Sequence, residues 1–411
     1  MAAVANEGPL SGIRVLDLAT VFAGPGAARR LADFGADVIK IERPGEGDGA
    51  RHLGETDGVD GYYWRLVGRN KRPIELDLKH EAGREVLLRL VQTADVLIEN
   101  FRPGVLERLG LDPQSVLLVK NPGLVVLRVT GFGQDGPYAS RAGFGTIAEA
   151  MSTFAHTTGQ PDGPPTLPPL ALADEVTGVL AAFSVLAALR HRDRTGEGQV
   201  IDATLLESML DIMGPGPTIA HRTGISDGRI GSRLWFSAPR NVYPCTDGWI
   251  CLSGSANSVA HRILAVVGGA EATNDPRFLT GAARLENIDE LDAMITAWTE
   301  RHSWSEAVRI LVEAGAAAGP IYNATQLLDD EHVQARGSIT SVPNPDGDGD
   351  LLQSAVTPRF SKTPGAVRHA GLRQGACTDQ VLAELGYSPA EIAALTEAGA
   401  IGSTPAAALS A

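Results

Sequence analysis

One carboxylate in this sequence stands where a covalent reaction could begin. Asp174 follows the Pro-rich residues 168–173 and begins a long apolar stretch with helical spacing. A carboxylate in the first turn of a helix is held ionised by the unpaired backbone N–H groups and the helix dipole. Such a group often serves only as a cap, but an ionised carboxylate is also a nucleophile that needs no general base. The residues alone therefore leave two roles open for Asp174, a helix cap and a covalent nucleophile.

The other motifs in the sequence favour no competing chemistry. Residues 131–136 read Gly-Phe-Gly-Gln-Asp-Gly and match a dinucleotide-binding fingerprint, but Pro137 follows at once and no helical pattern begins there. We therefore predict a tight turn at this point. The sequence has no Walker loop, no His-Glu-x-x-His and no Gly-x-Ser-x-Gly, and its three cysteines lack the spacing of a zinc site. We predict that the protein holds no metal.

The composition indicates an ordinary globular protein with two lobes. The chain has 411 residues, which is more than one hydrophobic core usually organises, and 44% of them are hydrophobic. A net charge of -14 argues against nucleic-acid binding, because such proteins present a basic surface. Residues 1–8 show no signal-peptide pattern, and we find no uncharged apolar run long enough to cross a bilayer. We expect a cytoplasmic protein that binds neither nucleic acid nor membrane.

The elements that must position Asp174 alternate between strands and helices. Short β-branched runs separated by helical patterns predict βαβ units around a parallel sheet. The expected strands lie at 13–18, 38–42, 95–99 and 124–129, and the expected helices at 24–34, 81–94 and 174–192. Ligands bind at the carboxyl ends of parallel strands. The amino end of the helix that carries Asp174 should therefore face the ligand crevice.

That helix is expected to bury one apolar stripe in the core. Helical spacing places five side chains on one face, namely Val176, Val179, Leu180, Phe183 and Leu186.

The pattern as a whole predicts an α/β protein with a Rossmann-like large domain and a smaller α+β domain. We place the large domain at 1–215, the smaller domain at 225–335, and a linker with a C-terminal return to the large domain at 340–411. The smaller domain should hold short strands near 241–253 and helices at 288–302 and 305–314. The Pro/Gly/Asp-rich residues 342–350 predict a loop or linker, and a helical stretch at 379–398 should pack on the large domain.

The order of short motifs along the chain resembles the family III CoA-transferases. This group includes formyl-CoA transferase and is related to alpha-methylacyl-CoA racemase. Any one motif is weak, but together they run nearly from end to end. The matching segments are residues 10–18, Ala23-Gly-Pro25, residues 35–45, Asn70-Lys-Arg72, residues 75–79, Glu99-Asn-Phe-Arg-Pro-Gly104, Asp174, Thr195-Gly-Glu-Gly-Gln199, Asp275-Pro-Arg-Phe278 and Ala335-Arg-Gly337.

The resemblance implies a covalent relay on Asp174. In the family, an aspartate at this position attacks an acyl-CoA thioester to form a mixed anhydride, and CoA thiolate then returns to give an aspartyl-CoA thioester. A free carboxylic acid takes the CoA in the second half of the reaction. The resemblance also implies a homodimer of two interlocked ring-shaped chains, with CoA and acyl-CoA as substrates and no tightly bound cofactor.

The resemblance also assigns residues to two ligand sites. The predicted CoA-binding residues are Val21, near the pantetheine end, with Arg43, Leu76, Lys79, Asn100, Phe101 and Arg108. An Arg side chain can bind a CoA phosphate through two parallel N–H groups, and a Lys side chain can bind it through its concentrated positive charge. The predicted pocket for the acyl group contains Phe22, Phe144, Gly145 and Gly254.

Positions at which this sequence differs from the related enzymes limit the reaction and the substrates that we expect. Racemases of the related branch carry a catalytic histidine where this chain has Phe144, and phenylalanine cannot exchange a proton. Formyl-CoA transferase has glutamine at the position of Phe22, an acidic residue at the position of Gly145 and a glycine-rich loop where residues 253–257 contain a single glycine. These differences argue against formate and oxalate, and they favour a bulkier or more apolar acyl group.

Two other functions stay open from the sequence. One is an acyl-CoA epimerase that pairs Asp174 with Glu149, His156 or Asp202 as a second acid or base. The other is a noncatalytic CoA-binding subunit.

Overall fold

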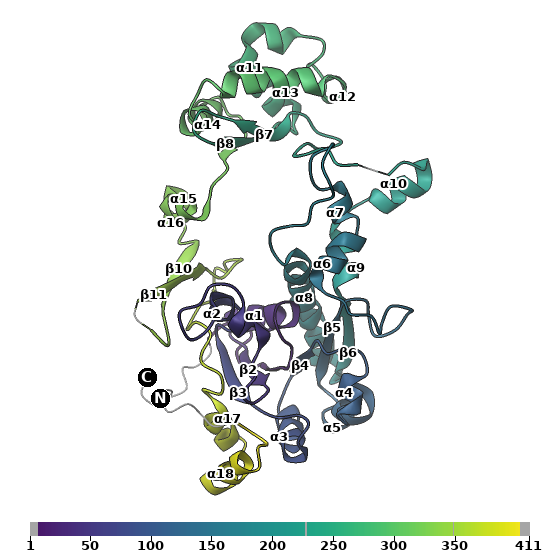
Figure 1. Cartoon of the computed structure of the whole chain (residues 1–411), viewed down its shortest axis with the longest axis vertical. Coiled ribbons are helices and arrows are strands. Elements are labelled where there is room, and N and C mark those ends of the chain that lie inside the picture. Colours follow the sequence, from purple (N-terminus) through teal and green to yellow (C-terminus); the bar gives the residue numbers. More distant parts are fainter. Residues whose placement is uncertain (1–6, 227, 348, 403–411) are drawn as a thin grey trace. The chain divides into compact units, whose positions relative to one another are not determined.

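The computed structural model describes residues 7–226, 228–347 and 349–402. The chain divides into two compact units (Figure 1). Unit 1 contains the described residues up to Phe154, Pro168–Pro215 and those from Ala335 onward. Unit 2 contains Ala155–Leu167 and Gly216–Gln334.

A six-stranded parallel sheet forms the centre of unit 1. Its order is β3-β2-β1-β4-β5-β6, the order of doubly wound dinucleotide-binding folds. The predicted parallel α/β architecture is thereby confirmed. The strands are β1 (Arg14–Asp17), β2 (Asp37–Glu42), β3 (Lys71–Glu75), β4 (Val96–Glu99), β5 (Val125–Thr130) and β6 (Gln199–Thr204). The sequence analysis located β1, β2, β4 and β5 but not the two edge strands.

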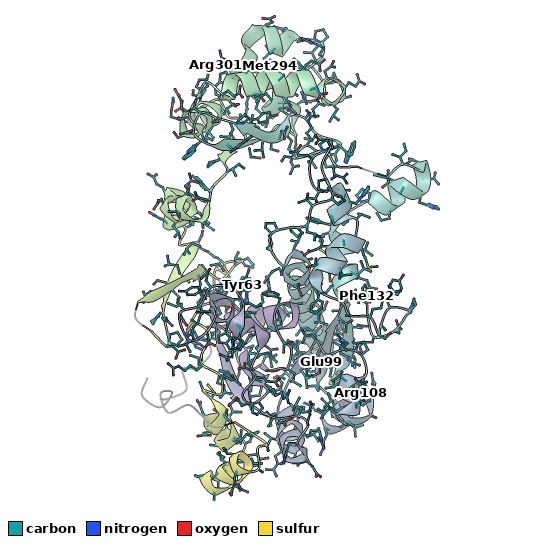
Figure 2. The ribbon with its side chains drawn as sticks, in the orientation of Figure 1. Tyr63, Glu99, Arg108, Phe132, Met294 and Arg301 are labelled. Carbon is teal, nitrogen blue, oxygen red and sulfur yellow. The ribbon has the colours of Figure 1, made fainter. Side chains whose placement is uncertain are left out.

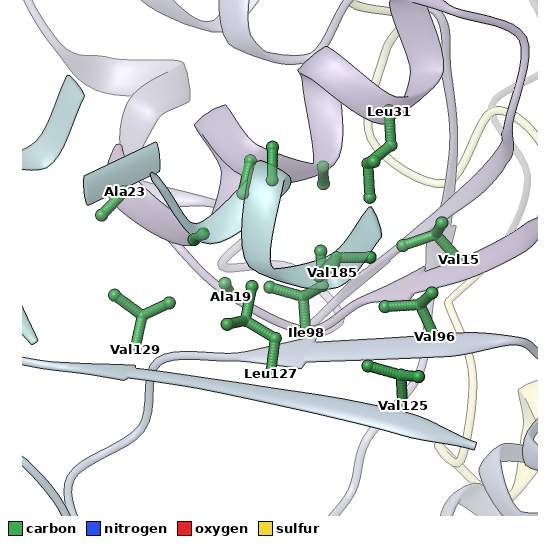
Figure 3. Close-up of a cluster of buried hydrophobic side chains, with 14 of the residues drawn as sticks. Val15, Ala19, Ala23, Leu31, Val96, Ile98, Val125, Leu127, Val129 and Val185 are labelled. Carbon is green, nitrogen blue, oxygen red and sulfur yellow. The ribbon is translucent and has the colours of Figure 1, made fainter. Parts of the chain in front are cut away.

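Alternate side chains of the strands feed two hydrophobic cores on opposite faces of the sheet. Val15, Val96, Ile98 and Leu127 point to one face, where they pack under α1 (Ala23–Asp33) and α8 (Leu172–Thr195), as Figure 3 shows. Leu16, Leu97 and their neighbours point to the other face and pack against α3 (Glu81–Val91). Successive residues of a strand point to opposite faces, so both faces of a parallel sheet can be buried.

The face that α8 buries differs from the predicted stripe. Val179, Phe183 and Leu186 are exposed in this chain, Phe183 with 69% of its surface. The helix instead buries a row of mostly small residues against α1 and the sheet, namely Ala173, Thr177, Gly178, Ala181, Ala182, Val185, Ala188 and Leu189. A Cβ added to Gly178 would lie 3.1 Å from the carbonyl oxygen of Ala23 in α1. The close packing of the two helices selects small residues, so the predicted apolar stripe was wrong.

By length and composition alone, α8 would pass as a helix able to cross a membrane. Such a result is weak support for a membrane span, because buried core helices have the same composition. In this structure α8 packs against α1 and one face of the sheet.

The C-terminal part of the chain returns to unit 1. Two antiparallel strands, β10 (Ile339–Pro343) and β11 (Asp350–Ser354), flank the predicted loop. The predicted helical stretch at 379–398 is two helices, α17 (Thr378–Glu384) and α18 (Pro389–Glu397), because Ser388 and Pro389 begin a new helix with a capping box. Val381 and Leu382 of α17 enter the core beside α3.

Unit 2 is a small α+β body with its own core. Its antiparallel strands are β7 (Arg240–Pro244), β8 (Trp249–Ser253) and β9 (Ala318–Pro320). Its main helices are α11 (Asn257–Asn274), α13 (Ile288–Thr299) and α14 (Trp304–Glu313). Residues 155–167, which the predicted division placed in the large domain, cluster with unit 2, where Arg229 donates to the carbonyl oxygens of His156 and Gly163.

The remaining helices are short. In unit 1 they are α2 (Tyr62–Val67), α4 (Val105–Arg108), α5 (Leu118–Lys120), α6 (Gly145–Met151), α9 (Leu205–Ile212) and the short turns Gly49–His52 and Pro113–Leu117; the others are α7 (Phe154–Thr157), α10 (Gly216–Thr223), α12 (Gly281–Glu286), α15 (Ala324–Asp329) and α16 (Glu331–Ala335).

The packing of α1 against α8 predicts a strong dependence on side-chain size. Ala181→Leu should lower the free energy of unfolding by about 1–3 kcal/mol, because the added carbons have no space in a close-packed core. Ala390→Leu is the control, because Ala390 is exposed on α18 (Pro389–Glu397) and is not part of the packing of α1 against α8. Urea unfolding of both variants measures the effect, and equal stabilities would contradict the described packing.

Candidate active site

A cavity of about 360 Å³ lies at the carboxyl ends of β1, β4 and β5. Between β1 and β4 the strand order reverses, which is where open α/β sheets bind ligands. Asp174 lies in this cavity, as expected from the sequence. The other lining residues are Thr20, Val21, Phe22, Ala23, Asn100, Phe101, Arg102, Pro103, Val129, Thr130, Gly131, Ala139, Arg141, Ala142, Gly143, Phe144, Gly145, Thr146, Ala171 and Leu205.

Asp174 does not cap its helix. The helix begins at Leu172 after Ala171, which offers no side-chain cap, so Asp174 is the third helical residue. The carboxylate of Glu149 does the capping instead, because its Oε1 accepts the backbone N–H of Ala173 at 3.1 Å. No cation pairs with Asp174 in the part of the chain that the structure describes. The capping role that the sequence left open therefore belongs to Glu149.

The environment of Asp174 makes its carboxylate unusually basic. Burial, followed by the charges of Glu149 and Glu175, raises the pKa of Asp174 to about 6. The carboxylate is thus ionised at neutral pH and is a better base and nucleophile than an exposed aspartate.

Gly145 gives Asp174 the room to occupy this position. A Cβ added to Gly145 would overlap Oδ2 of Asp174. Gly145 is also the first residue of α6, directly after Phe144. Phe144 exposes 71% of its surface in this chain while lining the cavity.

The loop between β1 and α1 forms the opposite wall and is held in a strained form. Val21 has a φ of 70°, a left-handed conformation that is costly for a β-branched residue. Its backbone N–H donates to Oδ1 of Asp48 at 2.9 Å. The neighbouring Thr20 exchanges two hydrogen bonds with the side chain of Asn100, both of 2.8 Å.

A buried ionic cluster lies under this loop. Asp48 pairs with Lys40 at 2.9 Å, and Asp17 pairs with Lys71 at 2.8 Å, with all four side chains inaccessible to solvent. The Lys40 ammonium also donates to the carbonyl oxygen of Ala19, two residues before Val21. Burial alone would raise the pKa of Asp48, but Lys40 and the backbone N–H groups of Ala50 and Val21 outweigh it and hold that pKa low.

The loop after β5 closes another side of the cavity. Gly131 and Gly143 approach so closely that a Cβ on either would lie 2.6 Å from the Cα of the other. Within this loop Gly133 and Gly136 have positive φ values, residues 131–136 bend, and no helix begins before Gly145, so the fingerprint-like residues do not lead into a helix. Arg141 stacks over the ring of Tyr138 at 3.5 Å.

The structure brings most of the predicted site residues together. Seven of them line the cavity, namely Val21, Phe22, Asn100, Phe101, Phe144, Gly145 and Asp174.

Five predicted residues lie elsewhere. The side chain of Leu76 is 1% exposed and packs in the core, so in this chain it does not line the cavity, and its assignment to CoA binding stays a prediction. Arg43 pairs with the exposed Glu46, Lys79 is exposed after β3, and Arg108 is the last residue of α4 (Figure 2). Gly254 belongs to unit 2, where its N–H donates to the carbonyl oxygen of Pro239.

Sequence reasoning missed several residues of the cavity and its support. Arg102 and Arg141 line the cavity, while Lys40 and Asp48 hold the Val21 loop from below. Arg102 lies inside the matched motif at residues 99–104, so the sequence did contain a signal for it. Asp48 had no such signal, because only the fold brings it to Val21.

Comparison with known proteins identifies the family of this chain and agrees with its fold. The model of CoA-transferase family III matches residues 10–372, and this chain belongs to that family. It is 40% identical over 379 residues to the succinyl-CoA–D-citramalate CoA-transferase of Chloroflexus aurantiacus, covering 92% of this chain and 94% of the relative. The protein is therefore a CoA-transferase-type enzyme.

Two further relatives extend the comparison. The formyl-CoA:oxalate CoA-transferase of Rhodopseudomonas palustris is 34% identical over 417 residues, covering 95% of this chain and 97% of the relative. A crystal structure of a CAIB/BAIF family protein from Brucella suis superimposes with a TM-score of 0.82 and 33% identity, covering 92% of this chain and all of the other. The family resemblance seen in the sequence is confirmed.

The contact between Gly145 and Asp174 predicts that a single methyl group will impair the enzyme. Gly145→Ala should lower kcat for CoA transfer by about 10²-fold, because the carboxylate must leave its position. Gly216→Ala is the control, because a Cβ there meets no atom within 4 Å. Steady-state assays measure the effect, with circular dichroism to verify folding. An unchanged kcat would show that Asp174 reacts from another position.

The buried pair of Asp48 and Lys40 predicts a pH-dependent contribution to stability. Asp48→Asn should lower the free energy of unfolding by about 3–5 kcal/mol at neutral pH, because Lys40 loses its nearest partner. The folded pKa of Asp48 is lowered, so the contribution is present above the unfolded pKa and is lost as pH falls through the folded pKa. Wild type and variant should therefore converge in acid.

Denaturant titrations at several pH values measure this difference. Arg309→Ala, which removes an exposed pair with Glu313, is the control and should change stability by less than about 1 kcal/mol. A constant gap between wild type and Asp48→Asn down to strongly acidic pH would contradict the assigned role.

Proposed function

We propose that this enzyme moves CoA from an acyl-CoA thioester to a free carboxylic acid through covalent intermediates on Asp174. The observation that supports this most directly is the position of Asp174. Its carboxylate is unpaired by any cation among the described residues, is not the N-cap of its helix, and faces a cavity at the carboxyl ends of the strands. A free, basic carboxylate in a ligand crevice suits nucleophilic attack on a thioester.

The proposed first half-reaction balances without any further reagent. Asp174 attacks the acyl carbonyl carbon, the C–S bond of the thioester breaks, and CoA leaves as a thiolate while the acyl group and Asp174 stay joined as a mixed anhydride. The thiolate then attacks the carbonyl carbon of Asp174, and the donor acid leaves with the bridging oxygen. The enzyme is left as an aspartyl-CoA thioester.

The second half-reaction repeats these steps with the acceptor acid. The acceptor carboxylate attacks the carbonyl carbon of the aspartyl thioester, which releases CoA thiolate and joins the acceptor to Asp174 as a second mixed anhydride. Attack of the thiolate on the acceptor carbonyl yields the new acyl-CoA and restores Asp174. Dividing the exchange in this way replaces one difficult step by several easier ones.

CoA binding is assigned to the cavity and to cations near the same edge of the sheet. Val21, Asn100 and Phe101 line the cavity and suit the pantetheine arm. Arg43, Lys79 and Arg108 follow β2, β3 and β4 respectively in the chain, and the carboxyl ends of parallel strands meet at one edge of a sheet. These three cations are proposed to bind the CoA phosphates.

The acyl group is proposed to be larger than formyl. Phe22, which packs edge-on against Tyr63 with ring centroids 5.3 Å apart, and Phe144 give the cavity apolar surface. The relative named for succinyl-CoA and D-citramalate is more similar to this chain than the relative named for formyl-CoA and oxalate. Succinyl-CoA is therefore the first donor to test.

The working form is proposed to be a homodimer with interlocked chains. The exposed apolar side chains of α8, Val179, Phe183 and Leu186, are compatible with cover by a second copy. Size-exclusion chromatography at falling protein concentration tests this, because interlocked chains should not dissociate on dilution. The cytoplasmic location stays a prediction from the sequence.

The covalent mechanism predicts that Asp174→Asn will be almost inactive. The amide has nearly the same shape but is not nucleophilic, so CoA transfer should fall by about 10³-fold or more. Intact-protein mass spectrometry after incubation with succinyl-CoA should show an adduct on wild type that hydroxylamine removes, and none on Asp174→Asn. Glu175→Gln is the control, because Glu175 is the next residue in the chain and its carboxylate pairs with Arg30 at 2.6 Å.

The same experiment separates the two alternatives. An epimerase would form no adduct and would place solvent deuterium at the α-carbon of the acyl group. Of its three candidate partners, only Glu149 is in contact with the first turn of α8, since Asp202 accepts the N–H of Gln134 and His156 lies in unit 2. A noncatalytic subunit would bind CoA without adduct or exchange.

A further inference from the structure

We propose that Glu149 is the positioning residue for Asp174, holding the first turn of α8 in place and keeping a second negative charge beside the nucleophile. This inference rests on the proposed covalent function. Glu149 is 2% exposed, and its Oε1 accepts the backbone N–H of Ala173, directly before Asp174.

One short helix supplies both contacts that position Asp174. Gly145 and Glu149 are four residues apart on α6, so they lie on the same face of that helix. Gly145 lies against Oδ2 of Asp174, and Glu149 binds the backbone one residue earlier. The start of α6 therefore lies against the carboxylate of Asp174, and one turn later the same helix binds the backbone N–H of Ala173.

Within the described part of the chain, no paired cation offsets the negative charge that Glu149 places beside Asp174. Among the described residues no cation pairs with Glu149, whereas Glu175 is paired with Arg30 at 2.6 Å and approached by Arg29 at 3.8 Å. Other charged groups lie on the elements packed against α8. Arg128 on β5 pairs with Glu99 and Glu107, and the remaining groups are Asp202 on β6 and Glu207 and Asp211 on α9. Arg102 and Arg141 line the cavity.

Keeping a carboxylate next to the nucleophile has a chemical consequence. Two neighbouring negative charges disfavour ionisation, so Asp174 becomes more basic and, once ionised, more nucleophilic. Burial and the charge of Glu149 are the first two causes that raise the pKa of Asp174. The rate of adduct formation should therefore fall as pH decreases through about 6 in the wild-type enzyme.

Two variants of Glu149 separate its charge from its hydrogen bond. Glu149→Gln keeps an oxygen that can accept the N–H of Ala173 but removes the charge. Its pH profile for adduct formation should have a midpoint about one unit lower than that of wild type. Glu149→Asp keeps the charge but withdraws the oxygen from Ala173, so its midpoint should stay close to that of wild type while its rate falls about tenfold.

The measurement is the single-turnover rate of adduct formation with succinyl-CoA across pH, using the intact enzyme. Glu175→Gln serves as the matched carboxylate control and should shift the midpoint less, because Arg30 already offsets that charge. A midpoint unchanged in Glu149→Gln, or a wild-type rate in Glu149→Asp, would overturn the proposal. Absence of any adduct in wild type would instead refute the covalent function on which it rests.

Discussion

The structure depends on placing two carboxylates, Asp174 and Glu149, at one buried helix end. Burying like charges together is unfavourable unless hydrogen bonds offset the lost hydration. The free N–H groups in the first turn of α8 supply part of that offset, and Glu149 uses one of them. Glu149 accepts the N–H of Ala173, and no cation among the described residues pairs with the carboxylate of Asp174.

This requirement explains several features that otherwise look unrelated. In this chain Gly145 leaves room for the carboxylate of Asp174, and small residues on α8 allow the helix to lie close to α1. Gly178 at this contact would place any Cβ 3.1 Å from Ala23, which itself lines the cavity. The close packing of α1 and α8 therefore brings the Val21 loop and Asp174 to the same cavity.

Much of the fold was predictable because its central strands are buried on both faces. β1, β2, β4 and β5 appear in the sequence as mainly apolar runs, whereas β3 contains Pro73 between charged ends, and half of the residues of β6 are polar. Both missed strands lie at sheet edges, where proline and polar side chains are tolerated. The buried face of α8 was mispredicted because the sequence analysis looked for large apolar residues at helical spacing, whereas the helix buries mostly small residues.

The site was only partly predictable for a related reason. The resemblance located Asp174 as a matching residue and Phe22 and Phe144 as departures from related enzymes, and all three line the cavity. The support from Lys40 and Asp48 depends on contacts across long stretches of chain, which local sequence patterns do not encode. The burial of Leu76 was not predicted, because its position in a motif does not reveal that its side chain packs into the core.

The central claim is that Asp174 forms and breaks bonds during CoA transfer, and transfer of an oxygen atom tests it most directly. The wild-type enzyme would turn over with succinyl-CoA and an acceptor acid whose carboxylate carries isotopically heavy oxygen. The peptide that contains Asp174 would then be isolated and weighed. The anhydride route predicts one heavy oxygen in Asp174 after a full cycle. Complete CoA transfer with no label in Asp174 would contradict the account.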